Sequence, residues 1–450
     1  MTHYRWVICA LLFCATTIIY VDRGILGVLQ KDFLMGQLGW NKVDYGLVSS
    51  CFSAGYALGF LFVGGLIDRI GVRRGLFFAF LVWSVVSVAH GLIGSIPAAA
   101  QLEIEFPGWF ATLLGWCGSS ATGVAVATTV AAFAAARFLL AFSEAGNFPG
   151  SIKAVSEWFP KRERALATGI FNAGSNVGAI AAPLAVPLIA AALGWQAAFY
   201  ATGLMSLVWV AFWMANYRAP DRHARVSAAE LACIRCDGPE SGRRMRWWPL
   251  LGRRQTWAFA LPKLLLDPCW WFYLIWLPGF FQEKHGLDIQ HIGLPLVTIY
   301  LMADVGSIAG GWLSSRLIKI GWTVNRSRKT ALLICALCVV PIFLAADTSN
   351  LWVAVGLIGL AAAAHQGFSA NLFTVVSDTV PRQAVSSVVG IGGTVGAIGG
   401  MLLPVIDGYI LKATNNDYHI PLLIPSAAYL VALASMHLIL PRLDAMKIES

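Results

Sequence analysis

Apolar residues fall in long blocks along this chain, separated by short polar stretches. Many blocks exceed 20 residues, which at 1.5 Å per helical residue crosses the roughly 30 Å hydrocarbon core of a bilayer. The pattern predicts an all-α polytopic membrane protein in which twelve transmembrane helices form two pseudo-symmetric six-helix halves. We place the spans at 6–28, 45–67, 74–95, 122–149, 164–192, 196–216, 256–281, 290–314, 329–346, 351–376, 385–411 and 420–440. The first half is 1–217, the central loop 218–255 and the second half 256–450.

Composition agrees with this pattern. Of the 450 residues, 58% are hydrophobic and 12% are charged, against about 25% charged in an ordinary soluble domain. The net charge of +9 could suggest a nucleic-acid partner, but the placement of the charges argues against one. Of the 32 Lys and Arg, 25 fall on the termini and the loops of their side, and four on the opposite loops. This asymmetry predicts that both termini lie in the cytoplasm.

The central loop contains a helix signal. Ser227 and Glu230 form an S-x-x-E capping box, which predicts a short surface helix. Its arginines are expected to face the anionic head groups of the inner leaflet; they include Arg218, Arg222, Arg225, Arg243, Arg244 and Arg246.

Nothing in the sequence indicates a cofactor, a metal site or an enzyme. The pairs Cys233–Cys236 and Cys335–Cys338 each form a C-x-x-C, but neither has a second pair or nearby histidines. We interpret both as chance. No nucleophile–base constellation, metal cluster or phosphate loop is present in the sequence.

The two halves repeat each other. Residues 64–69 (GGLIDR) align with 311–316 (GWLSSR) at an offset of 247, and 144–170 align with 365–391 at an offset of 221. The first half therefore carries about 26 additional residues, near 97–122 on the outer side. This insertion is too short for two spans, so we expect an interfacial or re-entrant loop. Paired halves with a binding site near the midplane are typical of secondary transporters.

Charged residues within the spans are the strongest candidates for function. Asp22 and Arg23 lie near the end of the first span, and Arg137 and Glu144 lie two helical turns apart in the fourth. A charge at such a depth costs roughly 2.5–3.5 kcal/mol on insertion scales and usually faces a bundle interior or a cavity. The alternatives are a first helix that ends before Asp22, or a structural ion pair. We favour a proton-titrating carboxylate beside a cation that holds an anion.

Other polar and aromatic groups admit two interpretations each. Lys263 and Asp267 are i,i+4 neighbours that can simply pair. The aromatic group Trp270, Trp271 and Tyr273 suits either a lipid-facing belt or the C–H face and hydroxyls of a sugar.

The remaining polar groups in the spans are equally open. Close packing explains Asn172, Ser175 and Asn176 about as well as ligand contact. Asp304 suits a gating or a structural contact, and His365 is better explained as a packing histidine than as a proton relay.

Several stretches carry a family resemblance. GGLIDRIGVRR (64–74), with its weaker second copy, resembles the major facilitator superfamily. YVDRGIL (20–26), LLDPCWWFYLIWLP (265–278) and the stretches 137–179 and 291–322 resemble its anion:cation symporter family, and in particular bacterial hexuronate transporters. The resemblance implies proton-coupled import of a sugar-acid anion by alternating access. It also implies a multi-pass protein of the bacterial inner membrane, which we expect to be a monomer.

The resemblance also implies roles for individual residues. Asp22 and Glu144 would take protons. The substrate site would include Tyr20, Arg23, Tyr56 and Arg137, with Ser175, Ser369 and Asn371 added by position and Asn172 and Tyr273 from the polar and aromatic patterns. An arginine offers the substrate carboxylate a planar fork that keeps its proton. A different carboxylate such as an aldonate is the alternative cargo, and a non-transporting sensor on the same fold is the alternative function.

Gly64, Asp68 and Arg69 are the predicted gating residues at the cytoplasmic end of the second span. An acid at this position can bond helix N-termini or basic groups when the inner side is closed, which would hold an outward-facing state. The alternative is that this loop serves only as an orientation signal.

Overall fold

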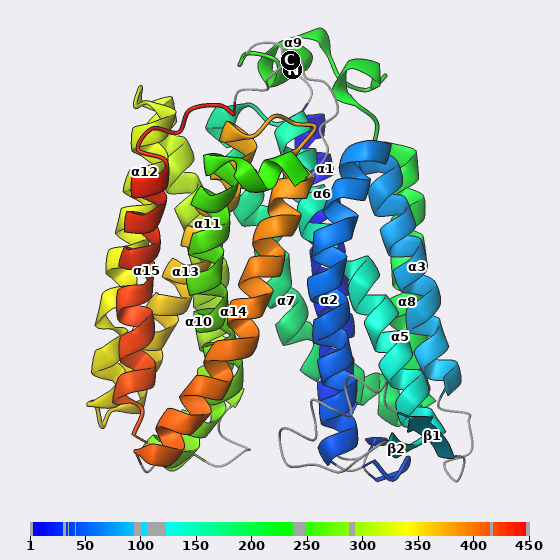
Figure 1. Ribbon diagram of the computed structural model, residues 1–450. Helices are drawn as coiled ribbons and strands as arrows, with labels where there is room; N and C mark the ends of the chain where they lie inside the picture. Colours follow the sequence, from blue (N-terminus) through cyan, green and yellow to red (C-terminus); the bar gives the residue numbers. More distant parts are fainter. Residues whose placement is uncertain are drawn as a thin grey trace.

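The computed structural model describes residues 3–29, 33–34, 36–40, 42–93, 101–105, 123–237, 248–287, 293–414 and 417–446. Long helices run side by side, and both chain termini lie at one end of the bundle (Figure 1). We call this the terminal end. The opposite end, which carries strands β1 and β2, is the strand end.

Helices occupy all twelve predicted positions. Those of the first half are α1 (Tyr4–Leu29), α2 (Lys42–Ile70), α3 (Val72–Ile93), α5 (Thr128–Glu144), α6 (Asn147–Trp158), α7 (Lys161–Leu193) and α8 (Gln196–Asn216). Those of the second half are α10 (Arg254–His285), α11 (Gly293–Lys319), α12 (Val324–Val339) with the 3₁₀ helix η4 (Val340–Ala346), α13 (Leu351–Thr379), α14 (Val385–Ala413) and α15 (His419–Ile439). Among the described residues, 11 helical segments are long and apolar enough to cross a membrane. Helix α10, which carries Lys263 and Asp267, occupies the remaining predicted position.

The fourth predicted span is divided into α5 and α6 directly after Glu144. Gly146 and Pro149 both weaken a helix at this point. Glycine is flexible in its backbone, and proline lacks the N–H that a helical hydrogen bond requires. A side chain at Gly146 would meet Val63 Cγ1 at 2.8 Å and Ala79 Cβ at 3.3 Å. The absence of a side chain at Gly146 therefore lets this segment pack closely against α2 and α3.

The insertion differs from the sequence-based expectation. Residues 101–105 and 123–127 form antiparallel strands β1 (Gln101–Glu105) and β2 (Gly123–Ala127), with Gln101 opposite Ala127. The helix predicted to start at 122 consequently begins at Thr128. The alternating valines of GVAVA fit a strand better than the first turn of a helix. The interfacial or re-entrant loop was expected near 97–122, of which residues 97–100 and 106–122 lie outside the described part.

The predicted helix after Ser227 is confirmed, and its first-turn acid has an additional role. The Ser227 side chain accepts a hydrogen bond from Glu230 N at 3.2 Å and begins α9 (Ala228–Ile234). The Glu230 carboxylate accepts from the backbone of Tyr4 and Arg5, at 3.1 and 3.0 Å. Arg5 also pairs with Glu163 at 2.9 Å, so the start of α1 joins the central loop to the start of α7.

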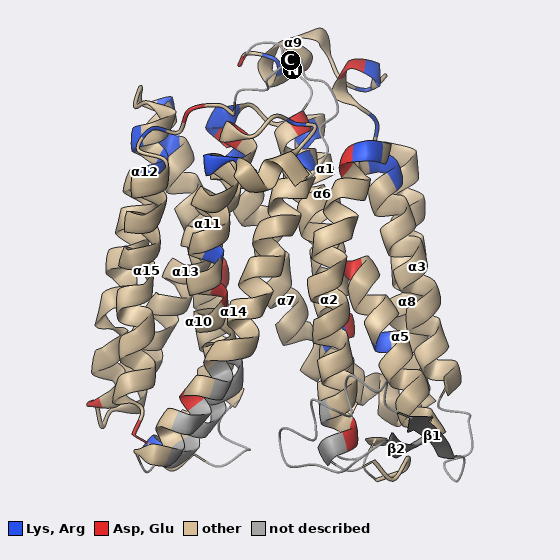
Figure 2. Ribbon diagram, in the orientation of Figure 1, with Lys and Arg blue, Asp and Glu red and all other residues tan. Residues whose placement is uncertain are grey.

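Charges are unevenly distributed along the bundle. Figure 2 shows Lys and Arg gathered at the terminal end, with few charges along the middle of the helices. Arg218, Arg222 and Arg225 of the central loop are exposed there, whereas Arg243, Arg244 and Arg246 lie outside the described residues. In the same loop, hydrogen bonds from Arg235 lower the pKa of the exposed Asp221 carboxyl.

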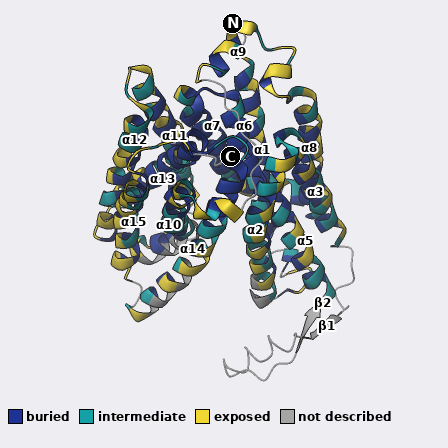
Figure 3. Ribbon diagram, turned by 45° about the horizontal axis from the view of Figure 1, so that its top comes forward, coloured by how far each residue is buried: buried dark blue, intermediate teal, exposed yellow. Residues whose placement is uncertain are grey.

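The outer surface of the bundle is apolar. Exposed positions face outward on many helices, and buried ones line the interior (Figure 3). Leu188 and Leu204, for example, are 73% and 62% exposed. An apolar exterior around a core that holds the polar groups suits helices surrounded by lipid.

Candidate functional site

A cavity of about 470 Å³ lies between the two halves. Side chains of α1, α2, α5, α6 and α7 line it from the first half, and those of α10, α11 and α13 from the second. Seven of the predicted substrate residues line it: Tyr20, Arg23, Tyr56, Arg137, Asn172, Ser175 and Ser369.

Arg23 is held by aromatic rings and a carboxylate. Its guanidinium carbon lies 4.7 Å from the ring centre of Tyr20, 4.4 Å from Tyr56 and 5.5 Å from Phe52. Its Nε atom pairs with Glu144 Oε1. The faces of aromatic rings attract a cation electrostatically, so these rings stabilise the charge of Arg23. Part of the Arg23 side chain stays open to the cavity.

Arg137 is a second cation on the cavity, on the face of α5 that also bears Glu144. Its guanidinium lies 5.9 Å from the rings of Phe52 and Phe199 and interacts electrostatically with both Asp22 and Glu144. Its Nε and Nη2 atoms are buried without a hydrogen-bond partner among the described residues, as is Glu144 Oε2. Buried donors of this kind are costly unless something else satisfies them.

Asp22 points away from the cavity although it adjoins Arg23. Its carboxylate accepts hydrogen bonds from Ser87 and Thr202, both at 2.8 Å, and from Trp83 at 3.4 Å. Successive helical residues diverge by about 100°, which separates the two charges. Helix α1 continues to Leu29, so both charges lie within the helix rather than beyond its end.

Two predicted substrate residues do not line the cavity. Tyr273 is 2% exposed and packs in the second-half core, where its ring lies 6.0 Å from that of Phe272. The Asn371 side chain donates to the backbone oxygens of Gly310 and Gly367, both at 2.9 Å, and joins α11 to α13. Residue spacing gave no means to tell cavity positions from such packing positions.

The second half contributes its own charged pair to the cavity. Lys263 and Asp267 pair at 2.5 Å, as their spacing predicted, and Lys263 lies 5.0 Å from the ring of Phe373. Trp270 also lines the cavity and stacks on His365 at 5.0 Å. His365 also lines the cavity and bonds to the Tyr429 hydroxyl at 2.5 Å, so both interpretations of this histidine stay open.

Helix α2 supplies cavity residues that the sequence analysis did not single out. Tyr45, Ser49, Phe52 and Ser53 line the cavity together with Tyr56. These polar and aromatic residues recur every three or four positions in an otherwise apolar helix. This spacing was the available signal, because residues so spaced share one helix face.

At the terminal end, Asp68 joins the two halves. Its carboxylate accepts hydrogen bonds from the first backbone amides of α14, at Ser386 (3.3 Å) and Ser387 (2.7 Å), and from the Ser387 hydroxyl at 2.6 Å. It also pairs with Lys153 at 2.8 Å. An anion at a helix N-terminus meets both unsatisfied N–H groups and the positive end of the helix dipole. The predicted contact between this acid and a helix N-terminus is therefore present.

A weaker contact occurs at the repeat-related position. Ser315, which aligns with Asp68, accepts a hydrogen bond from Leu166 N in the second turn of α7, at 3.3 Å. A side chain at Gly64 would collide with the backbone oxygen of Ser386, and one at Gly311 with that of Ala165. Gly64 corresponds to Gly311 at the offset of 247, and Ala165 corresponds to Ser386 at the offset of 221. The close contacts thus follow the alignment derived from sequence.

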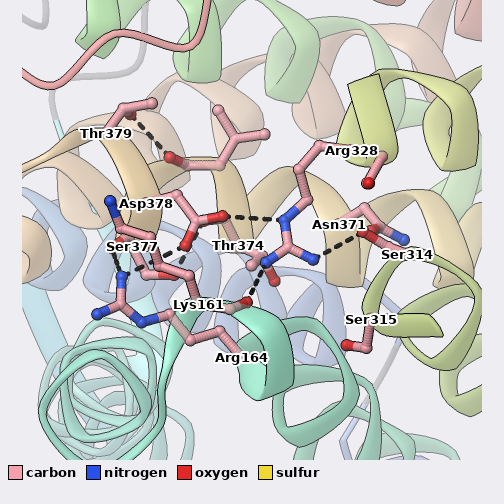
Figure 4. A network of polar contacts seen from close by, with 12 residues as sticks. Lys161, Arg164, Ser314, Ser315, Arg328, Asn371, Thr374, Ser377, Asp378 and Thr379 are labelled. Carbon is pink, nitrogen blue, oxygen red and sulfur yellow. Dashed lines mark hydrogen bonds and ion pairs between the residues drawn. The ribbon is translucent and has the colours of Figure 1, made fainter. Parts of the chain in front are cut away.

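Further polar contacts close the terminal end (Figure 4). Asp378 of α13 accepts from Arg328 of α12 at 2.9 Å and from Arg164 of α7 at 3.3 Å. Arg328 also donates to the backbone oxygen of Lys161 at 2.7 Å, and Arg164 to that of Ser377. Each arginine therefore contacts both halves. In the described part, this network and the Asp68 contact join the two halves at the terminal end.

Comparison with known proteins identifies the family. The family model of the major facilitator superfamily matches residues 12–404. The chain belongs to the major facilitator superfamily. It is therefore a multi-pass membrane protein, and its relatives are transporters rather than enzymes.

Several curated relatives are named as transporters of sugar acids. The chain is 27% identical to the probable galactarate/D-glucarate transporter of Bacillus subtilis (strain 168), over 92% of this chain and 87% of the relative. It is 28% identical to the hexuronate transporter of Escherichia coli (strain K12), over 86% and 83%. It is 29% identical to the galacturonate transporter of Dickeya chrysanthemi, over 72% and 86%.

Solved structures share the fold. The proton:xylose symporter XylE aligns with a TM-score of 0.72 at 13% identity, over 96% of this chain and 95% of its own. The transporter FucP in the outward conformation aligns with a TM-score of 0.67 at 14% identity, over 97% and 99%.

Proposed function

We propose that this protein is a proton-coupled symporter that imports a sugar-acid anion, a hexuronate such as glucuronate or galacturonate. It would act as a monomer in the bacterial inner membrane with both termini in the cytoplasm. The observation that carries the proposal is a pair of arginines on one cavity, of which Arg23 keeps 17% of its side chain exposed. A carboxylate in the cavity would pair with this guanidinium.

Charge balance supports proton coupling. Arg23 and Arg137 are offset by Asp22 and Glu144, so an arriving carboxylate leaves this group with one excess negative charge. One proton restores neutrality. Glu144 is the suited acceptor because it competes with the substrate for Arg23. Once protonated, Glu144 releases the guanidinium to the substrate.

Asp22 would carry a second proton. It lies outside the cavity lining, among three neutral donors, so its protonation need not await the substrate. The inside-negative potential opposes entry of an anion by about 2.3 kcal/mol per 100 mV. One proton per anion cancels this opposition, and a second makes the potential drive uptake.

The lining suits a polyhydroxylated ring. Tyr20, Tyr56 and Trp270 offer aromatic faces for C–H groups, and Asn172, Ser175 and Ser369 offer polar contacts for hydroxyls. A hexuronate presents both kinds of surface and one carboxylate. An aldonate has the carboxylate and hydroxyls but no ring, and it remains the alternative cargo.

Alternating access would use the contacts at the terminal end. With Asp68 bonded to the start of α14, that side is closed, which corresponds to an outward-facing state if the termini are cytoplasmic. Arg69 would act beside Asp68 at this gate, and Gly64 would permit the close approach of α2 and α14.

Reconstituted protein tests the proposal. Liposomes buffered at an internal pH above the external pH should accumulate labelled glucuronate, and a protonophore should abolish accumulation. Excess galacturonate should compete better than galactonate, and glucose, which has no carboxylate, should not compete. Uptake unaffected by the proton gradient would refute the coupling. Stronger competition by galactonate would replace the hexuronate with an aldonate.

A further inference from the structure

Three amide side chains at the cavity form one hydrogen-bonded chain across the two halves. Asn172 and Asn176 come from α7, and Gln366 comes from α13. All three line the cavity and are at most 5% exposed. Asn172 Nδ2 donates to Gln366 Oε1 at 2.7 Å, and Gln366 Nε2 donates to Asn176 Oδ1 at 3.4 Å. We call these three residues the amide chain.

Two residues of α11 terminate the amide chain, and neither lines the cavity. At one end, Asn172 Nδ2 also donates to Ser307 Oγ at 3.2 Å. The hydroxyl of Ser307 spends its only hydrogen on the backbone oxygen of Gly169, at 2.9 Å, so it can only accept from Asn172. At the other end, Asn176 Nδ2 donates to Asp304 Oδ1 at 2.8 Å. An ionised carboxylate has no proton to donate, so this end is also an acceptor.

The two ends require the same order of donors and acceptors. An amide can rotate by 180° and exchange its oxygen with its nitrogen, so a chain of amides with neutral ends has two orders of similar energy. Ser307 requires the nitrogen of Asn172 to face it, and Asp304 requires the nitrogen of Asn176. Fixing the nitrogen of Asn172 toward Ser307 orients Gln366, and Gln366 then orients the nitrogen of Asn176 toward Asp304. Starting from Asp304 gives the same order. Either end is sufficient to maintain the order.

The order decides which atoms remain for a ligand. Both hydrogens of Asn172 Nδ2 are used, and its Oδ1 has no partner among the described residues. Asn176 and Gln366 each use one amide hydrogen and keep one. The cavity therefore presents an acceptor at Asn172 and donors at Gln366 and Asn176. The reverse order would exchange these roles.

We propose that Ser307 and Asp304 are positioning residues that set the stereochemical selectivity of the cavity by fixing the order of the amide chain. The ligand class is a polyol, whose hydroxyls donate to Asn172 and accept from Gln366 and Asn176. This proposal rests on the proposed function for the identity of the polyol, a sugar acid. Epimers differ in where a hydroxyl points, so a fixed pattern distinguishes them and a reversible one does not.

A double-mutant cycle tests the proposal. Ser307→Ala removes one fixed acceptor, and Asp304→Asn replaces the other with a group that can donate or accept. The measured quantity is the ratio of kcat/KM for D-glucuronate and D-galacturonate, which differ only at the C4 hydroxyl. Thr298→Ala is the matched control, because Thr298 lies on α11 and, among the described residues, its hydroxyl bonds within its own helix, to Leu294 O at 2.8 Å.

The expected result is strong non-additivity. A hydrogen bond that reads the C4 hydroxyl should give the wild type a ratio of about tenfold in favour of one epimer. Each single variant should keep this ratio within about twofold because the other end maintains the order. The double variant should bring it to about one. Additive single effects, a wild-type ratio near one, or an unchanged ratio in the double variant would overturn the proposal.

A measurement without substrate separates this inference from the proposed function. With ¹⁵N-labelled glutamine, the Gln366 side-chain amide, assigned by its loss in Gln366→Leu, should give one pair of NMR signals in the wild type and in both single variants. The double variant should give two sets, one for each order. One set in all four proteins would overturn the fixed-order argument. Absence of sugar-acid uptake by the wild type would refute the proposed function while leaving this spectroscopic result to decide the order.

Discussion

At the residue scale, the central feature is that the neighbouring charged side chains of Asp22 and Arg23 point to different parts of the bundle. Arg23 faces the cavity and Glu144, whereas Asp22 faces Ser87, Thr202 and Trp83. The sequence predicted that both charges lie inside the bundle, from the cost of exposing them to lipid. It could not predict their separation in space, because the side of a helix that faces the cavity depends on how the helices pack.

Replacing Arg23 tests its role in binding the substrate. Arg23→Ala should weaken binding by about 2–5 kcal/mol, because the substrate loses a charge-assisted contact and Glu144 loses its partner. Arg23→Lys should recover little of this loss, since an ammonium lacks the planar fork. Binding can be measured by displacement of labelled glucuronate from purified protein. Exposed Arg218→Ala is the control, and equal affinities for the two alanine variants would place the carboxylate elsewhere.

Replacing each carboxylate separates their roles. Asp22→Asn and Glu144→Gln should both abolish accumulation driven by a pH gradient, because neither amide takes up a proton. Exchange of labelled for unlabelled substrate needs no net proton movement, so at least one variant should retain it. Counterflow in liposomes measures this exchange. Normal gradient-driven accumulation in both variants would contradict the assignment of these residues.

At the element scale, the contact between α2 and α14 depends on Asp68. In Asp68→Asn, the side chain keeps its shape but loses the charge that meets the start of α14 and Lys153. Transport should fall sharply, and a cysteine placed at Ser53 in the cavity should become accessible to an impermeant thiol reagent from the terminal side. Ser315→Ala, which removes only a neutral contact at the related position, should have a smaller effect. An unchanged accessibility pattern would contradict the gating role of Asp68. Only its place in the loop that orients the protein in the membrane would then remain.

The approach of these helices also depends on glycine. A methyl group at Gly64 would collide with the Ser386 backbone oxygen, so Gly64→Ala should favour the state that opens at the terminal end. Gly356→Ala in α13, where an added Cβ would have no described neighbour within 4 Å, should have no such effect. The same accessibility assay compares them. If both variants resembled the wild type, the close approach at Gly64 would not control the state.

At the same scale, the sequence predicted helices better than strands. Twelve apolar blocks marked twelve helix positions because lipid requires backbone hydrogen bonds to be satisfied within each segment. The strand β1 belongs to the insertion, where no such constraint applies, and β2 directly follows the insertion. A short run such as GVAVA, which alternates valine with small residues, predicts a strand only weakly. The helix after Ser227 was predictable since its start depends on neighbours in sequence alone.

At the scale of the whole molecule, the repeat explains where the halves touch. Gly64 contacts Ser386, and Gly311 contacts Ala165, which is the residue aligned with Ser386 in the repeat. Both interfaces use the same positions, but one has an acid where the other has Ser315. The sequence revealed this equivalence through its two offsets. It did not reveal the amide chain, because Asp304, Gln366 and Asn172 come from three separate helices.

The most direct test of the central claim is the movement of protons with the substrate. Liposomes containing the protein and a trapped pH indicator should have equal pH on both sides and no membrane potential at the start. Addition of external glucuronate should then acidify the lumen, because each entering anion brings at least one proton. Glu144→Gln should abolish this signal. Uptake of labelled glucuronate by the wild type without any lumenal acidification would contradict proton-coupled symport.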